Sequence, residues 1–263
     1  MRAAAVKRFV LVAALFAALA AAPAQQRAQE GAQDYAQERA AAPAQDRAEE
    51  RAAMVRAAAS LAAAAGVRRV DPELLAAMRA VPRHRFVPDG LRAFAYRDQA
   101  LPIGHGATIS QPAMVLMMTQ LLEPRPDHIV LEVGTGSGYQ AAILARLTRR
   151  VHSVEIVPEL AAGAAARLAG LGYANVAVRA GDGYAGWPEA APFDRILVTA
   201  GTDHVPPPLL DQLRPGGILV LPLGRDADSL QLTVVRKSRS GRISRRRVAP
   251  VRFVPLVRDP PAG

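Results

Sequence analysis

The sequence contains no cysteine among its 263 residues. This absence excludes disulfides, a cysteine nucleophile and thiolate-ligated zinc, and it leaves the cellular compartment open. We expect no metal site. Aromatic residues are also scarce, at 5%, although 51% of the chain is hydrophobic, much of it alanine. Acidic residues are outnumbered, 23 against 33 lysines and arginines, which gives a formal net charge of +10. Length and hydrophobic content allow one sizeable domain with accessory segments.

The first 24 residues have the pattern of an export signal. Three basic residues precede residue 9, and an uncharged apolar stretch covers residues 9–22. Ala22-Pro23-Ala24 then offers a small-x-small cleavage site, and the apolar run is short for a membrane-spanning helix. We expect a signal peptide over 1–24 and an exported, periplasmic protein. A leader that stays uncleaved as a membrane anchor is the alternative.

Residues 25–50 form a low-complexity segment with near-copies of one pentapeptide, such as Ala36-Gln37-Glu38-Arg39-Ala40. Almost none of its apolar side chains is larger than alanine, so it cannot bury enough surface to offset the entropy cost of ordering. We expect a linker there, a folded domain over 51–257 and a short tail over 258–263.

Two helices are expected at the start of the domain. The first has apolar residues at helical spacing and a C-cap glycine, Gly66. Its expected buried face consists of Ala53, Met54, Ala57, Leu61 and Ala64. Asp71 and Pro72 suit the N-cap and the first position of the second helix. Leu74, Leu75 and Met78 supply its buried face.

A glycine-rich turn is the centre of the sequence. Glu132-Val133-Gly134-Thr135-Gly136-Ser137-Gly138 lies between an apolar run over 129–131 and a helical pattern over 139–147. A strand, a glycine turn and a helix in this order expose backbone N–H groups to a bound cofactor. The dinucleotide fingerprint G-x-G-x-x-G requires a glycine where Tyr139 stands, which disfavours an NAD-dependent dehydrogenase. A tight turn in any α/β domain is the simpler alternative.

Apolar strands and amphipathic helices alternate after this turn. We expect strands over 151–155, 175–180, 194–200 and 218–223, and helices over 158–171 and 209–213. This alternation predicts a parallel sheet covered on both faces, whose ligands lie beyond the carboxyl ends of the strands. Residues 134–138, Glu155 and Asp182 all stand at such ends. A carboxylate at Glu155 is placed to accept hydrogen bonds from a ribose.

Two further regions are informative. Residues 96–112 are rich in Gly, Pro and small hydroxyls, which predicts a loop that lines a site or makes an ordinary connection. His105 in this loop has no partner acid, so we expect a solvent-facing or satisfied histidine rather than a general base. Residues 230–236 and 242–248 predict a hairpin, and 251–256 a further strand.

Seven lysines or arginines lie between residues 236 and 247 of that hairpin. A basic hairpin can bind nucleic acid or anionic lipid, but such charges also protect an edge strand from pairing. No aromatic residue interleaves with the charges, so we interpret the hairpin as a solvated edge and expect no nucleic acid partner.

Six segments of the chain resemble protein-L-isoaspartate O-methyltransferases, in the same order along residues 51–257. They are 81–88, 101–112, 132–138, 181–183, 213–223 and 253–256. The resemblance implies a Rossmann-like α/β methyltransferase fold, with a seven-stranded, mostly parallel sheet, helices on both faces and an N-terminal helical extension. It also implies methyl transfer from S-adenosylmethionine to the free α-carboxyl of L-isoaspartyl residues in damaged proteins, which begins repair through a succinimide.

The resemblance assigns roles to residues of the turn and the neighbouring strand ends. Gly134, Gly136 and Gly138 allow the backbone to approach the methionine part of the cofactor, in the turn that also contains Glu132 and Ser137. Glu155 corresponds to the residue that holds the ribose hydroxyls. Asp182 and Gly183 match the position that contacts adenine.

The loop residues Thr108, Ile109 and Ser110 match the family's loop over the cofactor, and Ser110 falls where the active-site serine is placed. Methyl transfer to a carboxylate needs no general base, because a carboxyl group with a pKa of about 4 is already ionised at neutral pH. We therefore expect Ser110 to position the acceptor by hydrogen bonding rather than to act as a nucleophile.

The leader is an addition to a family that is ordinarily cytoplasmic, and export separates the enzyme from the cytosolic source of its cofactor. The alternatives are an exported methyltransferase that acts on another carboxyl or small molecule, and a non-catalytic envelope binding protein. We expect a monomer whose partners are isoaspartyl proteins and peptides, and membrane contact only if the leader stays uncleaved.

Overall fold

The computed structural model describes residues 47–67, 69–226 and 228–258. The expected signal peptide, residues 25–46 of the expected linker and residues 259–263 of the expected tail lie outside these ranges. No helix among the described residues is both long and apolar enough to cross a membrane.

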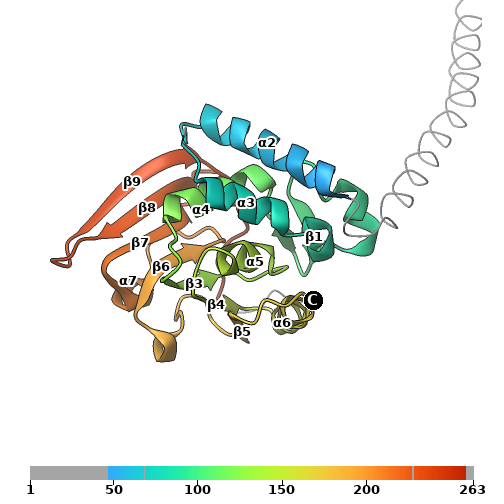
Figure 1. Cartoon of the computed structure of the whole chain (residues 1–263). Helices are drawn as coiled ribbons and strands as arrows, with labels where there is room; N and C mark the ends of the chain where they lie inside the picture. Colours follow the sequence, from blue (N-terminus) through green and yellow to red (C-terminus); the bar gives the residue numbers. More distant parts are fainter. Residues whose placement is uncertain (1–46, 68, 227, 259–263) are drawn as a thin grey trace, which may run out of the picture.

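A seven-stranded sheet forms the centre of the domain, in the order β5-β4-β3-β6-β7-β8-β9 (Figure 1). Its strands are β3 (Ile129–Val133), β4 (Arg150–Glu155), β5 (Val176–Ala180), β6 (Phe193–Val198), β7 (Leu213–Leu223), β8 (Gln231–Lys237) and β9 (Ile243–Pro250). The first five in spatial order pair in parallel, and β8 and β9 pair antiparallel. The expected α/β fold with a mostly parallel seven-stranded sheet is confirmed.

Helices cover both faces of this sheet. The connecting helices are α4 (Pro112–Leu122), α5 (Tyr139–Ala145), α6 (Pro158–Gly170) and α7 (Pro207–Gln212). One apolar cluster joins α4, α5 and Leu168 of α6 to the side chains of Val130, Val151 and Leu197. The opposite face of the sheet packs against α7 through Leu209. Adjacent strand residues point to opposite faces, so the central strands β3, β4, β6 and β7 contribute to both clusters.

Two further helices, α2 (Ala48–Ala64) and α3 (Pro72–Ala80), lie outside α4 and α5 (Figure 1). Asp71 caps α3 as expected, because its Oδ1 accepts the N–H of Glu73 at 2.8 Å. The expected buried face of α2 is wrong in part. Met54, Val55, Ala58 and Ala62 are buried, whereas Leu61 is 48% exposed. In a helix this rich in alanine, the spacing of small apolar residues does not distinguish one face from the next.

The folded region includes the last residues of the expected linker. Helix α2 begins at Ala48, and Arg47 before it is only 2% exposed. Arg47 pairs with Glu50 through Nε at 2.9 Å, donates from Nη1 to the carbonyl of Arg92 at 2.9 Å, and lies over the ring of Tyr96. The boundary between linker and domain therefore precedes residue 51, because a charged anchor holds this end of α2.

Three connections differ from expectation. The expected loop over 96–112 contains a two-stranded hairpin, β1 (Leu101–Gly104) and β2 (Ala107–Ile109), and two 3₁₀ helices, η2 (Arg83–Phe86) and η3 (Asp89–Phe94), precede it. β7 begins at Leu213, five residues before the expected strand over 218–223, and its pairing with β6 is irregular near this start. Residues 251–256 do not form a strand and make one bridge, Gly201 to Pro255.

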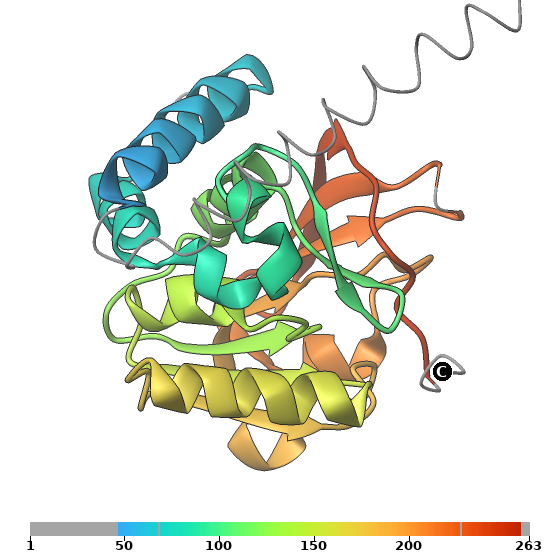
Figure 2. The same ribbon diagram turned by 90° about the vertical axis from the view of Figure 1, so that its right-hand side faces the viewer.

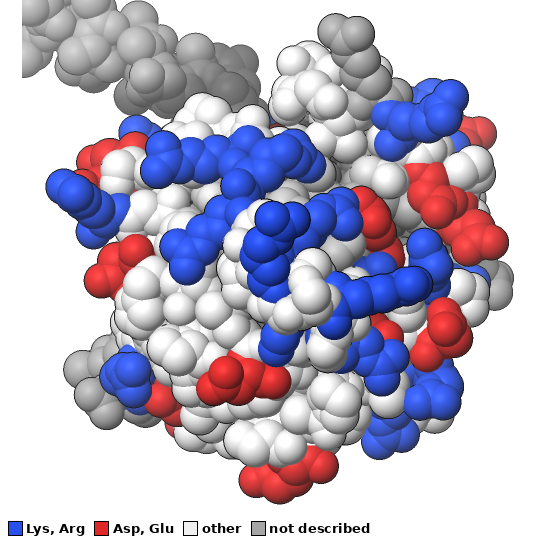
Figure 3. All heavy atoms as spheres, turned by 90° about the vertical axis from the view of Figure 1, so that its left-hand side faces the viewer, with Lys and Arg blue, Asp and Glu red and all other residues white. Residues whose placement is uncertain are grey.

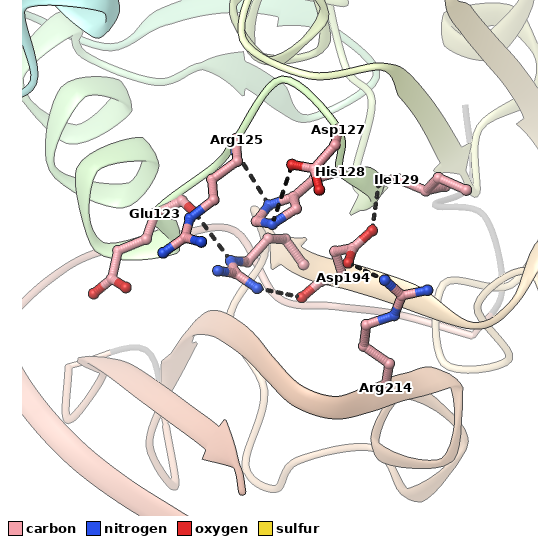
Figure 4. Close-up of polar contacts among 8 residues, drawn as sticks. Glu123, Arg125, Asp127, His128, Ile129, Asp194 and Arg214 are labelled. Carbon is pink, nitrogen blue, oxygen red and sulfur yellow. Dashed lines mark hydrogen bonds and ion pairs between the residues drawn. The ribbon is translucent and has the colours of Figure 1, made fainter. Parts of the chain in front are cut away.

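Polar contacts fix the amino ends of the central strands (Figure 4). Asp194 of β6 accepts the N–H of Ile129 at 2.8 Å and pairs with Arg214 of β7. Arg195 donates to the carbonyl of Glu123 at 3.1 Å and to that of Asp194 at 2.8 Å. These contacts hold β3, β6 and β7 in register at the end of the sheet opposite the carboxyl ends.

Candidate active site

A cleft of about 210 Å³ lies at the carboxyl ends of β3, β4 and β6. The hairpin β1–β2, the glycine turn after β3, and residues 254–257 enclose it. Figure 2 shows this C-terminal stretch passing beside the hairpin. We call residues 251–257 the closing segment. Gly201 holds it, because the N–H of Gly201 donates to Val254 at 2.8 Å and its carbonyl accepts the N–H of Leu256 at 2.7 Å.

Two glycines of the turn border the cleft. Gly134 and Gly136 have φ angles of 95° and 51°, in the left-handed region that other residues rarely adopt. A Cβ on Gly134 would collide with Oγ1 of Thr199, and one on Gly136 would lie 3.3 Å from the side chain of Ile103. Backbone rather than side chain therefore forms this wall of the cleft.

The third glycine has a different role. Gly138 does not border the cleft, and a Cβ there would lie 3.1 Å from Leu168 and 3.4 Å from Ala164, both on α6. The absence of a side chain at Gly138 allows α5 to approach α6 closely, and the expected contact with the cofactor stays a prediction. Ser137 is buried beside it, and its Oγ accepts the N–H of Tyr139 at 3.3 Å.

Glu155 lies at the end of β4 with its carboxylate fixed against the turn. Its Oε2 accepts the N–H of Gly136 at 2.7 Å, and its Oε1 accepts the N–H of Val157 at 3.1 Å. The residue is only 6% exposed but borders the cleft. Because each carboxylate oxygen has more than one acceptor position, Glu155 can hold ligand hydroxyls while it orders the turn.

Glu132 is fully buried under the turn and does not border the cleft. Its Oε2 accepts a hydrogen bond from Ser153, whose hydroxyl also contacts that of Thr135. Burial raises the pKa of Glu132 to about 8, against the opposing hydrogen bond from Ser153, and the charge of Glu155 raises it further. This pKa favours the protonated form of Glu132 at neutral pH, and the residue supports the turn from beneath; its expected contact with the cofactor stays a prediction.

Asp182 and Gly183 follow β5 and differ in their placement. Gly183 borders the cleft, and a Cβ there would collide with Val133 and lie 3.2 Å from Leu256. The Asp182 side chain accepts the N–H of Tyr184 at 2.8 Å and lies 3.7 Å from Arg258. Asp182 is therefore adjacent to the cleft without bordering it.

The expected loop residues connect the cleft to a second cavity. Thr108 borders the cleft, and Thr108, Ile109 and Ser110 border a narrow space of about 40 Å³ beside the glycine turn, which we call the neck. A separate outer pocket of about 560 Å³ is lined by Ser110, Met114 and Phe253 among others. Thr108 and Thr199 line all three spaces, so the cleft, the neck and the outer pocket adjoin one another at these two residues.

Asp98 fixes the chain next to Ser110. Its Oδ1 accepts the N–H of Ala113 at 2.7 Å, and its Oδ2 accepts the side-chain amide of Gln111 at 3.3 Å. These contacts satisfy the amino end of α4, which Gln111 and Pro112 begin. Ser110 is thereby held at the neck by a rigid helix start.

The expected site residues thus divide into three groups. Thr108, Gly134, Gly136, Glu155 and Gly183 border the cleft; Thr108, Ile109, Ser110, Gly134, Gly136 and Ser137 border the neck; Glu132, Gly138 and Asp182 border neither. His105 borders the cleft from the exposed hairpin tip, where it has a φ of 51°.

Comparison with known proteins decides the family. The family model for protein-L-isoaspartate(D-aspartate) O-methyltransferase matches residues 61–260. Protein-L-isoaspartate O-methyltransferase 1 of Nitrosospira multiformis is 56% identical over 194 residues, which cover 74% of this chain and 82% of that protein. The enzyme of the same name from Cupriavidus necator is 52% identical over 208 residues, 78% of this chain and 80% of that protein. The chain belongs to the protein-L-isoaspartate O-methyltransferase family.

Solved structures agree with this family. One protein-L-isoaspartate O-methyltransferase is 27% identical with a TM-score of 0.67, over 76% of this chain and 65% of that one. A putative member from Plasmodium falciparum, in complex with S-adenosyl-L-homocysteine, is 25% identical with a TM-score of 0.63, over 72% of this chain and 92% of that one. The Rossmann-like methyltransferase fold expected from the sequence is confirmed.

Thr199 is a residue of this methyltransferase site that sequence reasoning did not single out. It follows β6 and borders the cleft, the neck and the outer pocket. Its Oγ1 contacts the carbonyl oxygens of Gly134 at 2.7 Å and Val133 at 3.0 Å. Its place at the carboxyl end of a strand, like that of Glu155, was the available signal.

The residues present fit the methyl donor of a protein-L-isoaspartate O-methyltransferase. Gly183 leaves room that a Cβ would fill, between apolar walls from Val133 and Leu256. Glu155 presents a carboxylate at the next strand end, and the backbone of Gly134 and Gly136 faces the same space. Apolar walls suit a nucleobase, a carboxylate suits ribose hydroxyls, and exposed backbone suits a polar amino-acid end.

Proposed function

We propose that this protein methylates the free α-carboxyl of L-isoaspartyl residues in damaged proteins, with S-adenosylmethionine as methyl donor. Membership of the protein-L-isoaspartate O-methyltransferase family supports the reaction. One structural observation carries it: the cleft and the outer pocket share Thr108 and Thr199 in their walls, and Ser110, two residues after Thr108, lines the outer pocket and the neck. A donor and a protein acceptor can therefore enter from two sides and meet.

The cleft residues hold the donor. Glu155 accepts hydrogen bonds from the ribose hydroxyls, and Gly183 with its apolar neighbours packs against the adenine. Gly134 and Gly136 place backbone against the methionine part. Asp182 is assigned to the adenine end by the family resemblance, and its side chain accepts the N–H of Tyr184 next to Gly183. S-adenosylmethionine supplies a methyl group activated by a sulfonium.

The chain's contribution to the chemistry is alignment and exclusion of water. An acceptor carboxylate is ionised at neutral pH, so no residue has to remove a proton. Ser110, which lines the outer pocket, donates a hydrogen bond that orients the acceptor carboxylate. The closing segment and the hairpin shield the cleft from solvent. The methyl ester then closes to a succinimide with loss of methanol, and hydrolysis returns part of the material to normal aspartate.

A peptide assay tests the function. The purified protein is incubated with labelled S-adenosylmethionine and with paired peptides that differ only in isoaspartate or aspartate at one position. We expect label in the isoaspartyl peptide alone. Equal labelling of both peptides, or of neither, would refute the proposal, and labelling of another carboxyl compound would indicate a different acceptor.

Two substitutions separate donor binding from acceptor positioning. Asp182→Ala should weaken binding of S-adenosylhomocysteine in calorimetry, because the adenine end loses a polar contact. Ser110→Ala should leave that affinity nearly unchanged and lower turnover, because Ser110 borders the neck and the outer pocket rather than the cleft. A serine variant that loses donor affinity would reverse this division of roles.

We propose in addition that the protein is exported with the first 24 residues as a cleaved signal. The basic start, the uncharged stretch over 9–22 and Ala22-Pro23-Ala24 support this location. Amino-terminal sequencing of the mature protein in its native host should begin near Gln25. A mature chain that still begins at Met1 would contradict cleavage.

A further inference from the structure

The hairpin at the edge of the sheet carries a row of exposed positive charge. β9 is the last strand in the sheet order, and Arg245, Arg246 and Arg247 are consecutive and exposed on it. The hairpin projects at the left of Figure 1, and Lys and Arg side chains form a broad band on the face seen from that side (Figure 3). We call residues 245–247 the arginine ridge.

The arginine ridge has no acidic partner within the described ranges of the chain. Two neighbouring cations have acidic partners: Arg236 pairs with Glu123, and Arg252 lies 3.5 Å from Asp228, whereas Arg239 and Arg242 at the hairpin turn have none among the described residues. Lys237 donates to the carbonyls of Leu210 and Leu213, both at 2.8 Å. The ridge therefore presents charge that the fold itself does not neutralise.

The arginines extend to both sides of a free edge. Arg245 lies opposite Val235 and Arg246 opposite Val234 on β8, and alternation places them on opposite faces of the sheet. Val234 and Val235 are buried, whereas the arginines beside them are exposed. No strand among the described residues pairs with the outer backbone of β9. An extended anionic chain can lie along this edge with cations above and below it.

The ridge leads directly to the outer pocket. β9 ends at Pro250, and residues 250–254 line that pocket together with Ser110. Arg247 precedes Val251 by four positions, which corresponds to about 13 Å along an extended chain. A polypeptide with one residue in the outer pocket would reach the ridge within about four residues of its own.

We propose that the arginine ridge is a docking surface for an acidic, extended stretch of the acceptor protein, next to its isoaspartyl residue. This inference rests on the proposed function, because the outer pocket is then the acceptor site. The ridge raises the affinity for acceptors that carry several carboxylates on one flank, and it adds nothing for acceptors with neutral flanks. Its effect acts through exposed charges, so added salt weakens it.

The observations favour a polypeptide over nucleic acid. The ridge is three cations long, and the described hairpin has no aromatic side chain between them on which bases could stack. Its continuity with a pocket built for a peptide carboxylate gives an acidic protein segment a direct path. Nucleic acid remains an outcome that the test distinguishes.

Isoaspartyl peptides with matched flanks test the inference in the full-length protein. One peptide carries four glutamates before the isoaspartate, a second carries them after it, and a third has glutamines at all these positions. At about 50 mM salt, we expect kcat/KM for one acidic peptide to exceed that of the glutamine peptide about tenfold. The triple variant Arg245→Ser, Arg246→Ser, Arg247→Ser should lose this preference and keep the activity on the glutamine peptide, and about 0.5 M salt should have the same effect on the native chain.

A charge-matched control separates the ridge from the overall charge. Arg56, Arg69 and Arg149 are exposed arginines outside the hairpin, and their replacement by serine removes the same number of charges. This control should keep the preference.

The inference is overturned if neither acidic peptide is preferred, if the ridge variant keeps the preference, or if the control loses it equally. Tight binding of a labelled DNA duplex that needs the ridge, without any peptide preference, would assign the surface to nucleic acid instead. Absence of methylation on the glutamine peptide would refute the proposed function itself.

Discussion

At the scale of single residues, Thr199 connects the glycine turn to both large cavities. Its hydroxyl contacts the Gly134 carbonyl at 2.7 Å and fills the space that a Cβ on Gly134 would need. Thr199→Val keeps the shape but leaves that carbonyl without its donor. We expect affinity for S-adenosylhomocysteine, measured by calorimetry, to fall about tenfold, which corresponds to about 1.4 kcal/mol. Thr199→Ser keeps the hydroxyl and should retain most of the affinity; equal losses in both variants would contradict a role for the hydrogen bond.

Glu132 makes stability depend on pH. The folded protein keeps a proton on this buried carboxyl up to about pH 8, whereas the unfolded chain loses it above its ordinary pKa of 4.5. The free energy of unfolding therefore falls as pH rises between these values and levels off above the folded pKa. Glu132→Gln is neutral in both states, so at pH 7 it should be more stable than the native chain by about 3 kcal/mol.

Urea unfolding at pH 5, 6, 7 and 8 measures this difference. The gap between Glu132→Gln and the native chain should widen by about 1.4 kcal/mol per pH unit up to the folded pKa. The exposed Glu73 provides the control, since Glu73→Gln should follow the pH profile of the native chain. A gap that stays constant with pH would show that Glu132 is ionised in the folded protein.

Residue roles were predictable where chemistry alone decides them. Glu155 was expected at the site from its position after a strand, and Ser110 from the family resemblance; Glu155 borders the cleft and Ser110 the outer pocket. Gly138 belongs to the same glycine pattern, but its function depends on Leu168 and Ala164, which lie in a different helix. The spacing of the glycines in the sequence does not reveal which residues of another helix each glycine contacts.

At the scale of elements, the contact between α5 and α6 depends on Gly138. Its φ is 86°, and a Cβ would press on Leu168 and Ala164. Gly138→Ala should lower the free energy of unfolding by about 3 kcal/mol, from backbone strain and overpacking together. Gly172 has a φ of 81° and nothing within 4 Å of an added Cβ, so Gly172→Ala should show the strain alone, about 1–2 kcal/mol. Equal losses in urea unfolding would exclude the packing contribution.

Long elements were predictable and short ones were not. The expected helix over 158–171 matches α6 closely, and the expected strand over 218–223 matches the second half of β7, because sustained apolar patterns determine them. The hairpin β1–β2 has strands of four and three residues, too short for any alternation to be recognised. The closing segment has the composition of a strand, but the free edge of the sheet ends at β9, and the segment crosses to Gly201 instead.

At the scale of the whole molecule, Arg47 marks where the folded domain is anchored. The side chain is buried, pairs with Glu50 and stacks on Tyr96. Arg47→Ala should lower the free energy of unfolding by about 2 kcal/mol, through lost charged hydrogen bonds and cation–π contact. Arg56→Ala, an exposed change on the same helix, should stay within about 0.5 kcal/mol of the native chain. Equal stability of the two variants would place the domain boundary after residue 47.

The domain boundary could not be read from composition. Arg47 and Glu50 continue the alanine, glutamine and charge pattern of the preceding repeats, and only their tertiary partners, Arg92 and Tyr96, distinguish them. The overall fold, by contrast, followed from the order of its strands and helices. Strands and helices alternate many times along the chain, so the fold can be predicted even if one element is misjudged. The position of a domain boundary depends instead on a few tertiary contacts.

The closing segment has a thermodynamic consequence. Val254 borders both the cleft and the outer pocket, and Gly201 holds it by its carbonyl oxygen. Two ligands that contact opposite sides of this backbone stretch change each other's binding affinity. If bound donor raises the affinity for the acceptor by ordering this stretch, bound acceptor must raise the affinity for the donor by the same factor. This follows because the free-energy changes around the thermodynamic cycle of the free, singly bound and doubly bound protein sum to zero. The closing segment thus forms a wall common to both sites and couples the binding of one substrate to the binding of the other.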